Sequence, residues 1–143
     1  MSFQFKFDAR AVEKKIAGIK KRSTNSKKVM NEIAKAEVKD ARRRIRTTKT
    51  DPEGRNWKAW SYTTILSRIK DGTAARGLLY KSGLLYRSFV MKTTNKKMEI
   101  KNTADYAGYL QDGTNKMVAR PYLGFSKASA RRIKKLFKKH LGL

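Results

Sequence analysis

A stripe of apolar residues at helical spacing runs through the N-terminal third of the chain and constrains its fold more than any other feature. Its members are Met30, Ile33, Ala34, Val38, Ala41 and Ile45. The opposite positions are basic: Lys27, Lys28, Lys35, Lys39, Arg42, Arg43 and Arg46. This pattern predicts a long amphipathic helix, whose apolar face must be covered by other elements of the same domain.

Two further helices are predicted at the ends of the chain. Near the start, Val12, Ile16 and Ile19 share a helical face after Asp8, which can cap the helix. Near the end, Ser126 precedes a stripe formed by Ala130, Ile133, Phe137 and Leu141. We expect that stripe to seat on a sheet. The basic residues between its members would then face outward: Arg131, Arg132, Lys134, Lys135, Lys138 and Lys139.

Alternating residues predict the strands. Phenylalanines at positions 3, 5 and 7 alternate with polar residues, which is typical of a strand with one buried face that joins the sheet. Residues 85–93 and 97–101 also alternate, and the polar residues between them favour an antiparallel hairpin. Short helices are predicted over 61–70 and 103–111, the second ended by Asp112-Gly113, and an extended segment over 117–123, with Pro121 at an edge or a bulge.

These elements predict one domain over residues 1–143 with an α+β fold. An antiparallel β-sheet packs against amphipathic helices, with a long N-terminal helix and a C-terminal helix. At 143 residues and 39% hydrophobic content, the chain can form one core.

The charge of the chain predicts negatively charged partners. Thirty-six basic residues against 11 acidic ones give a net charge of +25, and no acid follows Asp112. Such a surface attracts nucleic acid through counterion release, and it would equally suit an acidic protein ring. The candidate partner-facing or DNA-facing residues lie on two helices: Arg42, Arg43, Arg46, Arg131, Lys134, Lys135 and Lys138. The alternative for both faces is plain solvation.

The sequence predicts no enzyme, no cofactor and no metal site. There is no cysteine, and the single histidine, His140, lies among lysines at a helix end, where an imidazolium suits the helix dipole. No nucleophile, phosphate-binding or metal-binding motif occurs. Trp57 and Trp60 could stack on bases or pack in the core. No signal peptide or membrane-spanning run is evident, so we expect a soluble protein made inside a cell.

Three ordered motifs in the second half of the chain resemble a known family. SGLLYRSF (residues 82–89) is followed by YAGYLQDGT (106–114) and ARPYL (119–123). Together they resemble the signatures of bacteriophage tail-completion and head–tail joining proteins, including the phage Mu-type virion morphogenesis family. The matching residues are Gly83, Leu85, Ser88, Tyr106, Ala107, Gln111, Gly113, Arg120, Pro121, Tyr122 and Leu123. Gln111 stands where relatives often carry glutamate, and Leu110 where Mu-type members often carry histidine.

The resemblance implies a structural virion protein of the phage neck. Such a protein would complete the tail and join it to the head connector as a homo-oligomeric ring around the DNA channel. Its partners would be further copies, head connector or adaptor proteins, tail terminator or tube proteins, and the DNA passing through, with no membrane. It would reside in the virion, and in the host cytoplasm during assembly. The alternative is a sequence-nonspecific nucleic-acid-binding protein. Within the motif region, Arg120 is expected to pair with Asp112 or Asp105.

Overall fold

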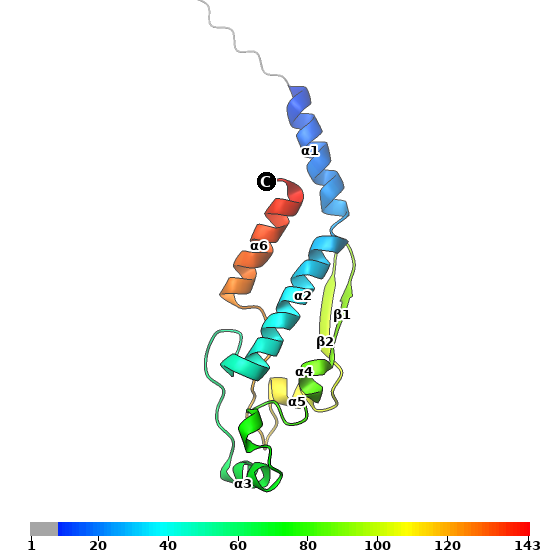
Figure 1. The fold of residues 1–143 in the computed structure, drawn as a ribbon. Coiled ribbons are helices and arrows are strands. Elements are labelled where there is room, and N and C mark those ends of the chain that lie inside the picture. Colours follow the sequence, from blue (N-terminus) through cyan, green and yellow to red (C-terminus); the bar gives the residue numbers. More distant parts are fainter. Residues whose placement is uncertain (1–8) are drawn as a thin grey trace, which may run out of the picture.

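The computed structural model describes residues 9–143, which form an α+β fold as predicted (Figure 1). The helices are α1 (Ala9–Thr24), α2 (Lys27–Arg43), α3 (Tyr62–Lys70), α4 (Leu84–Arg87), α5 (Ala107–Asp112) and α6 (Lys127–Leu141). The strands are β1 (Phe89–Thr93) and β2 (Met98–Asn102). A π-helical turn (Arg44–Thr48) extends α2, and a 3-10 turn spans Ala74–Arg76. The strand predicted around the first phenylalanines lies outside the described residues.

Helix α2 is the central element, with α6 on one side and the β1–β2 hairpin on the other (Figure 1). The predicted stripe is confirmed, since the residues that α2 buries include Ile33, Ala34, Val38 and Ala41, and Ile45 in the following turn is also buried. Around that turn the main core gathers residues from distant parts of the chain: Ile45, Trp57, Leu79, Leu85, Ala104, Ala107 and Tyr122. Trp57 is therefore a core residue, as its packing alternative predicted.

The N-terminal helical region is divided into α1 and α2 at Asn25–Ser26. Ser26 is buried, and its hydroxyl donates to the Ser23 carbonyl (2.9 Å), which satisfies a peptide oxygen at the end of α1. Helix α1 continues beyond the body of the molecule (Figure 1), and its predicted apolar face is uncovered, with Val12 43% and Ile16 59% exposed. Only its end meets α6, where the Arg22 guanidinium donates to the Leu141 carbonyl (2.7 Å).

The predicted hairpin is confirmed, with Met91 opposite Ile100 in the antiparallel register. The strand predicted from residue 85 instead starts at Phe89, because residues 84–87 form α4. Gly83 adopts a left-handed conformation (φ 80°) that turns the chain into this helix, and the helical turn buries Leu85 while leaving Leu84 exposed. The segment predicted as extended over 117–123 forms no ladder; only an isolated bridge joins Thr114 and Met117.

Helix α6 begins at the predicted cap, where the Ser129 N–H donates to the Ser126 hydroxyl (2.9 Å). It packs on α2 and α1 rather than on the sheet. Ser129 is its one buried residue among those described, while Ile133, Phe137 and Leu141 of the predicted stripe are half-buried and Ala130 is exposed.

Arg132 was predicted to face outward, and this is wrong. Its guanidinium bridges the Glu37 and Asp40 carboxylates of α2, at 2.8 Å from Asp40. Glu37 is 2% exposed and also accepts a hydrogen bond from the Ser129 hydroxyl (2.9 Å). The pairing has a clear cause: a carboxylate buried at this depth requires a cation and hydrogen-bond donors.

We predict that Arg132→Ala destabilises the protein by about 3 kcal/mol, because it leaves the Glu37 carboxylate buried without its cation. Arg131→Ala is the matched control: Arg131 is exposed, and its loss should change the free energy of unfolding by less than about 0.5 kcal/mol. Urea unfolding followed by circular dichroism measures both. Equal effects of the two substitutions would contradict the buried ion pair.

Candidate functional site

The ARPYLG segment (residues 119–124) has no regular secondary structure; Arg120 and Tyr122 are buried, and the other four residues are half-buried. Buried backbone groups outside helices and sheets need other hydrogen-bond partners. Here side chains from three other segments supply them, and most of the family-motif residues participate. We call residues 119–124 the central segment.

Gln111, at the end of α5, binds the central segment as a neighbouring strand would. Its side-chain nitrogen donates to the Leu123 carbonyl (2.8 Å), and its side-chain oxygen accepts from the N–H groups of Tyr122 and Leu123 (3.1 Å each). An ionised glutamate at this position could accept both N–H bonds but could not donate to the carbonyl. The glutamine that departs from the family pattern therefore satisfies more of the buried backbone than glutamate would.

Two buried side chains bind three more carbonyls of the central segment. Arg44 donates to the carbonyls of Tyr122 (3.1 Å) and Gly124 (3.3 Å), and the Trp57 indole donates to that of Pro121 (2.8 Å). Burial lowers the pKa of Arg44 from its ordinary value. Both side chains therefore act inside the fold, and neither offers a surface for ligands.

Arg120 does not pair with Asp112 or Asp105, and that prediction is wrong. Its guanidinium donates to the carbonyls of Lys58 (2.8 Å) and Ala59 (2.9 Å). The tertiary structure brings two consecutive carbonyls of the loop before α3 against this buried arginine, and the fork of guanidinium donors matches them. Arg120 thereby fixes the loop on the central segment.

The other motif residues also have structural surroundings. Tyr122 is buried; its hydroxyl donates to the Ala107 carbonyl (3.3 Å), and its ring meets Phe89 edge to face. Gly113 has φ 77°, and a Cβ there would lie 2.7 Å from the Ala119 nitrogen. Leu85 and Ala107 belong to the core, and the Ser88 carbonyl accepts from the Thr103 N–H (2.9 Å). Tyr106 differs, being 39% exposed. The motif therefore describes the interior of the fold.

The predicted cations of α2 gather along a groove between α2 and β1. Its cationic lining comprises Lys35, Lys39, Arg42, Arg43 and Arg46, with Tyr86 and Met91 on the opposite wall. Arg42 is partly fixed, since it donates to the Tyr86 carbonyl (3.1 Å), and Arg46 stacks 4.2 Å from the Tyr80 ring centroid. We call this the α2 groove. Packing on aromatic rings orders Arg42 and Arg46.

The second predicted cationic face lies along the outside of α6. Arg131, Lys134, Lys135, Lys138 and Lys139 line it together with Leu143. Within residues 9–143 none of these five cations forms a salt bridge. We call this the α6 face; it leaves its charge available to a partner.

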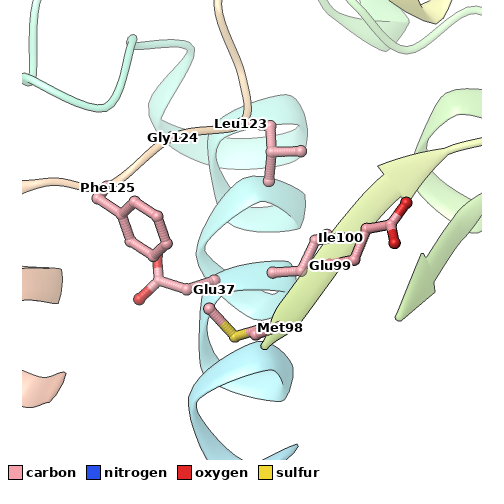
Figure 2. Close-up of a pocket in the computed structure, with 7 residues that line it drawn as sticks. All are labelled: Glu37, Met98, Glu99, Ile100, Leu123, Gly124 and Phe125. Atoms are coloured by element: carbon pink, nitrogen blue, oxygen red, sulfur yellow. The ribbon is translucent and has the colours of Figure 1, made fainter. Parts of the chain in front are cut away.

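The sequence analysis missed an apolar pocket between α2, β2 and the residues after the central segment (Figure 2). Its apolar walls are Met98 and Ile100 of β2 on one side and Leu123 and Phe125 on the other. Phe125 is 60% exposed although it is a large apolar residue. A large apolar residue directly after Leu123-Gly124, outside any predicted stripe, was the sequence signal that could have indicated this site.

The described residues contain neither a metal-binding cluster nor a membrane-spanning helix. No group of three or more histidine, aspartate or glutamate side chains within 9–143 is arranged to hold a metal ion. None of the helices in this range combines the length and apolarity required to cross a bilayer.

In the comparison with protein families, the model of the phage virion morphogenesis family matches residues 7–142. The match includes all the motif residues and both cationic faces. No curated protein and no solved structure matches the chain.

We predict that Gly113→Ala destabilises the protein by at least about 2 kcal/mol, because it strains a positive φ and forces a Cβ against backbone atoms. Gly108→Ala, one turn earlier in α5 with no heavy atom within 4 Å, is the control and should stabilise by about 0.5 kcal/mol. Thermal and urea unfolding measure both. A neutral Gly113→Ala would show that the turn can relax.

We predict that Tyr122 makes the protein sensitive to alkaline pH. Burial, with a smaller contribution from Asp112, raises the pKa of Tyr122 to about 12. Between the unfolded pKa near 10 and that value, only the folded state keeps the phenol proton, so stability falls as pH rises.

The test compares the wild type with Tyr122→Phe by urea unfolding at several pH values. At pH 8 the variant should be less stable by about 1 kcal/mol, through loss of the hydroxyl's hydrogen bond. Towards pH 12 the wild type should lose up to about 3 kcal/mol relative to it. Tyr109→Phe, at a 61% exposed position, is the control. A constant difference between wild type and Tyr122→Phe would contradict the pKa.

Proposed function

The chain belongs to the phage virion morphogenesis family, and from this membership we propose that it is a structural protein of the phage neck. In this role it completes the tail and joins it to the head connector as a ring around the DNA channel. The family places the chain among the components of the virion, which interact with other virion proteins. The ring, the position in the neck and the named neighbours are our proposal.

The observation that carries the proposal is the contrast between the interior and the surface. The motif residues serve mainly the packing and backbone hydrogen bonds of the fold, whereas large apolar side chains remain exposed at opposite ends of an elongated molecule (Figure 1). Helix α1 exposes Val12 and Ile16 at one end, and α3 exposes Tyr62 and Ile69 at the other. Exposed apolar patches mark interaction sites. Patches at two different ends suit head-to-tail contacts, which close into a ring when the rotation permits.

The charge supports a negative partner along the channel. Copies with a net charge of +25 repel one another unless a negative partner compensates. The α6 face meets this condition if it contacts DNA phosphates or an acidic neighbouring ring. The proposed role is geometric, so we assign the chain no catalytic activity and no cofactor.

The α6 face provides the test. We predict that changing Arg131, Lys134, Lys135 and Lys138 to glutamine leaves the fold intact but blocks completion of infectious particles. A phage lacking this gene is complemented with the variant, and plaque titre is measured beside the melting curve of the purified protein. The matched control changes four exposed hairpin lysines, namely Lys92, Lys96, Lys97 and Lys101, to glutamine and so removes the same charge elsewhere.

A large fall in titre for the α6 variant alone supports a specific contact through this face. Normal titre for that variant would show that the charge serves solubility only. Equal falls for both variants would show that total charge, and not the face, matters.

One observation favours a second function, sequence-nonspecific binding of nucleic acid. The α2 groove gathers five cations beside aromatic residues, and the described residues contain no DNA-recognition motif that would read base edges. Negative-stain microscopy with and without nuclease separates the two functions. Rings that persist after nuclease treatment support the neck protein, and assemblies that dissolve support the nucleic-acid-binding protein.

A further inference from the structure

The outer edge of β2 is open for strand pairing. Thr94 N–H donates to the Lys97 carbonyl (2.8 Å) and Thr103 N–H to the Ser88 carbonyl (2.9 Å), which sets the alternation of the ladder. The N–H and C=O groups of Met98 and Ile100 therefore point away from β1. Within residues 9–143 the sheet has only two strands, so these groups form a free edge. Such an edge is a template for another strand.

The apolar pocket of Figure 2 lies directly beside this edge. The side chains of Met98 and Ile100 form one wall, and the exposed ring of Phe125 stands across from them. A strand added to β2 would place every second side chain on the face of Met98 and Ile100, and thus over the pocket. The site therefore fits an extended segment with large apolar residues at alternate positions.

The chain itself contains a segment of this kind in residues 1–8, MSFQFKFD, which lie outside the described structure. In an extended segment, Phe3, Phe5 and Phe7 would share one face, and Ser2, Gln4 and Lys6 the other. The spacing of the phenylalanines equals that of Met98 and Ile100. Residues 1–8 of the chain therefore have the pattern required of the strand that pairs with β2.

The sheet of the same copy is out of reach of this segment. Helix α1 has 16 residues and so spans about 24 Å, and it leads away from the hairpin (Figure 1). The near end of the hairpin is at Lys27, whose N–H donates to Asn95 (2.9 Å). Phe3 precedes Ala9 by six residues, which cover at most about 20 Å when extended. With α1 in place, the phenylalanines fall short of the hairpin, and the pocket beside Glu37 is farther still.

We propose that the N-terminal segment of one copy adds as a strand to the outer edge of β2 of the next copy, with its phenylalanines over the Met98–Phe125 pocket. This contact is heterologous, because the donating and accepting surfaces differ. The inference rests on the ring of the proposed function and names one contact that builds it. Because α1 projects from the body of the molecule, the N-terminal segment can reach the neighbouring copy.

Cross-linking between two single variants tests the contact. The chain has no cysteine, so introduced thiols are the only ones. Copies with Phe5→Cys and copies with Phe125→Cys, carrying different tags, are mixed at moderate salt and oxidised gently. We expect a disulfide-linked dimer containing both tags, because the paired strand brings the two positions close. Gln4→Cys, on the opposite face, is the matched control and should cross-link several-fold less.

Three results would overturn the proposal: no mixed dimer, equal cross-linking of Phe5→Cys and Gln4→Cys, or a disulfide formed only within one chain when both cysteines are in the same copy. Sedimentation velocity adds a readout without cysteines. Changing Phe3, Phe5 and Phe7 to alanine should abolish self-association and leave the melting temperature unchanged, whereas changing Ser2, Gln4 and Lys6 to alanine should preserve both.

The two proposals fail differently. If the phenylalanine variant still forms wild-type rings, strand donation is wrong and the ring stands. If the mixed dimer forms but loss of the phenylalanines leaves plaque titre normal, strand donation is right and the neck function is wrong.

Discussion

The fold depends on hydrogen bonds from side chains to the backbone of the central segment. This segment is partly buried and has no neighbouring strand, so its inward peptide groups would be unsatisfied if the surrounding side chains did not reach them. Gln111, Arg44 and Trp57 bind its carbonyls and N–H groups, and Arg120 extends the network to the loop before α3. Removal of any one partner leaves a buried polar group alone, which costs more than the bond itself contributes. The network therefore fixes how α2, α5 and the central segment lie together.

The same requirement determines how charge is divided between the interior and the surface. Two of the few acids, Glu37 and Asp40, bind Arg132 between α2 and α6. Carboxylates used in this way are not available to neutralise the outer cations, and the α6 face stays positive. The outer cations of α6 therefore repel one another, and a negative partner can relieve this repulsion.

Apolar surface is left over in a similar manner. The core forms around the end of α2, whereas α1, α3 and Phe125 keep large apolar side chains exposed. These surfaces, together with the open edge of β2, are the features expected of a subunit whose packing is completed by its neighbours. In the assembly that we propose, neighbouring copies cover the apolar surface that the fold of one copy leaves exposed.

Features that depend on local periodicity and capping could be predicted from the sequence. The stripe from Ile33 to Ile45, the cap at Ser126, the hairpin and the α+β class follow from residues close together in the chain. The family resemblance likewise rested on ordered motifs, and the family match confirms it. The two cationic faces could be identified because helical spacing gathers like charges without any knowledge of contacts.

The contacts between residues far apart in the chain depend on the tertiary structure. For Arg120, charge alone favoured a nearby acid as the partner, but the side chain binds the carbonyls of residues 58–59. For Arg132, charge alone favoured an exposed position, but the side chain binds the acids of α2. Residues 84–87 alternate as in a strand. They form a helical turn instead, because the left-handed Gly83 turns the chain there and the turn buries Leu85 in the core. The pocket beside β2 joins residues 98–100 to residues 123–125, and no local pattern encodes such a meeting. Contacts of this kind depend on the packing of the whole chain, since each is set by what the other elements leave unsatisfied.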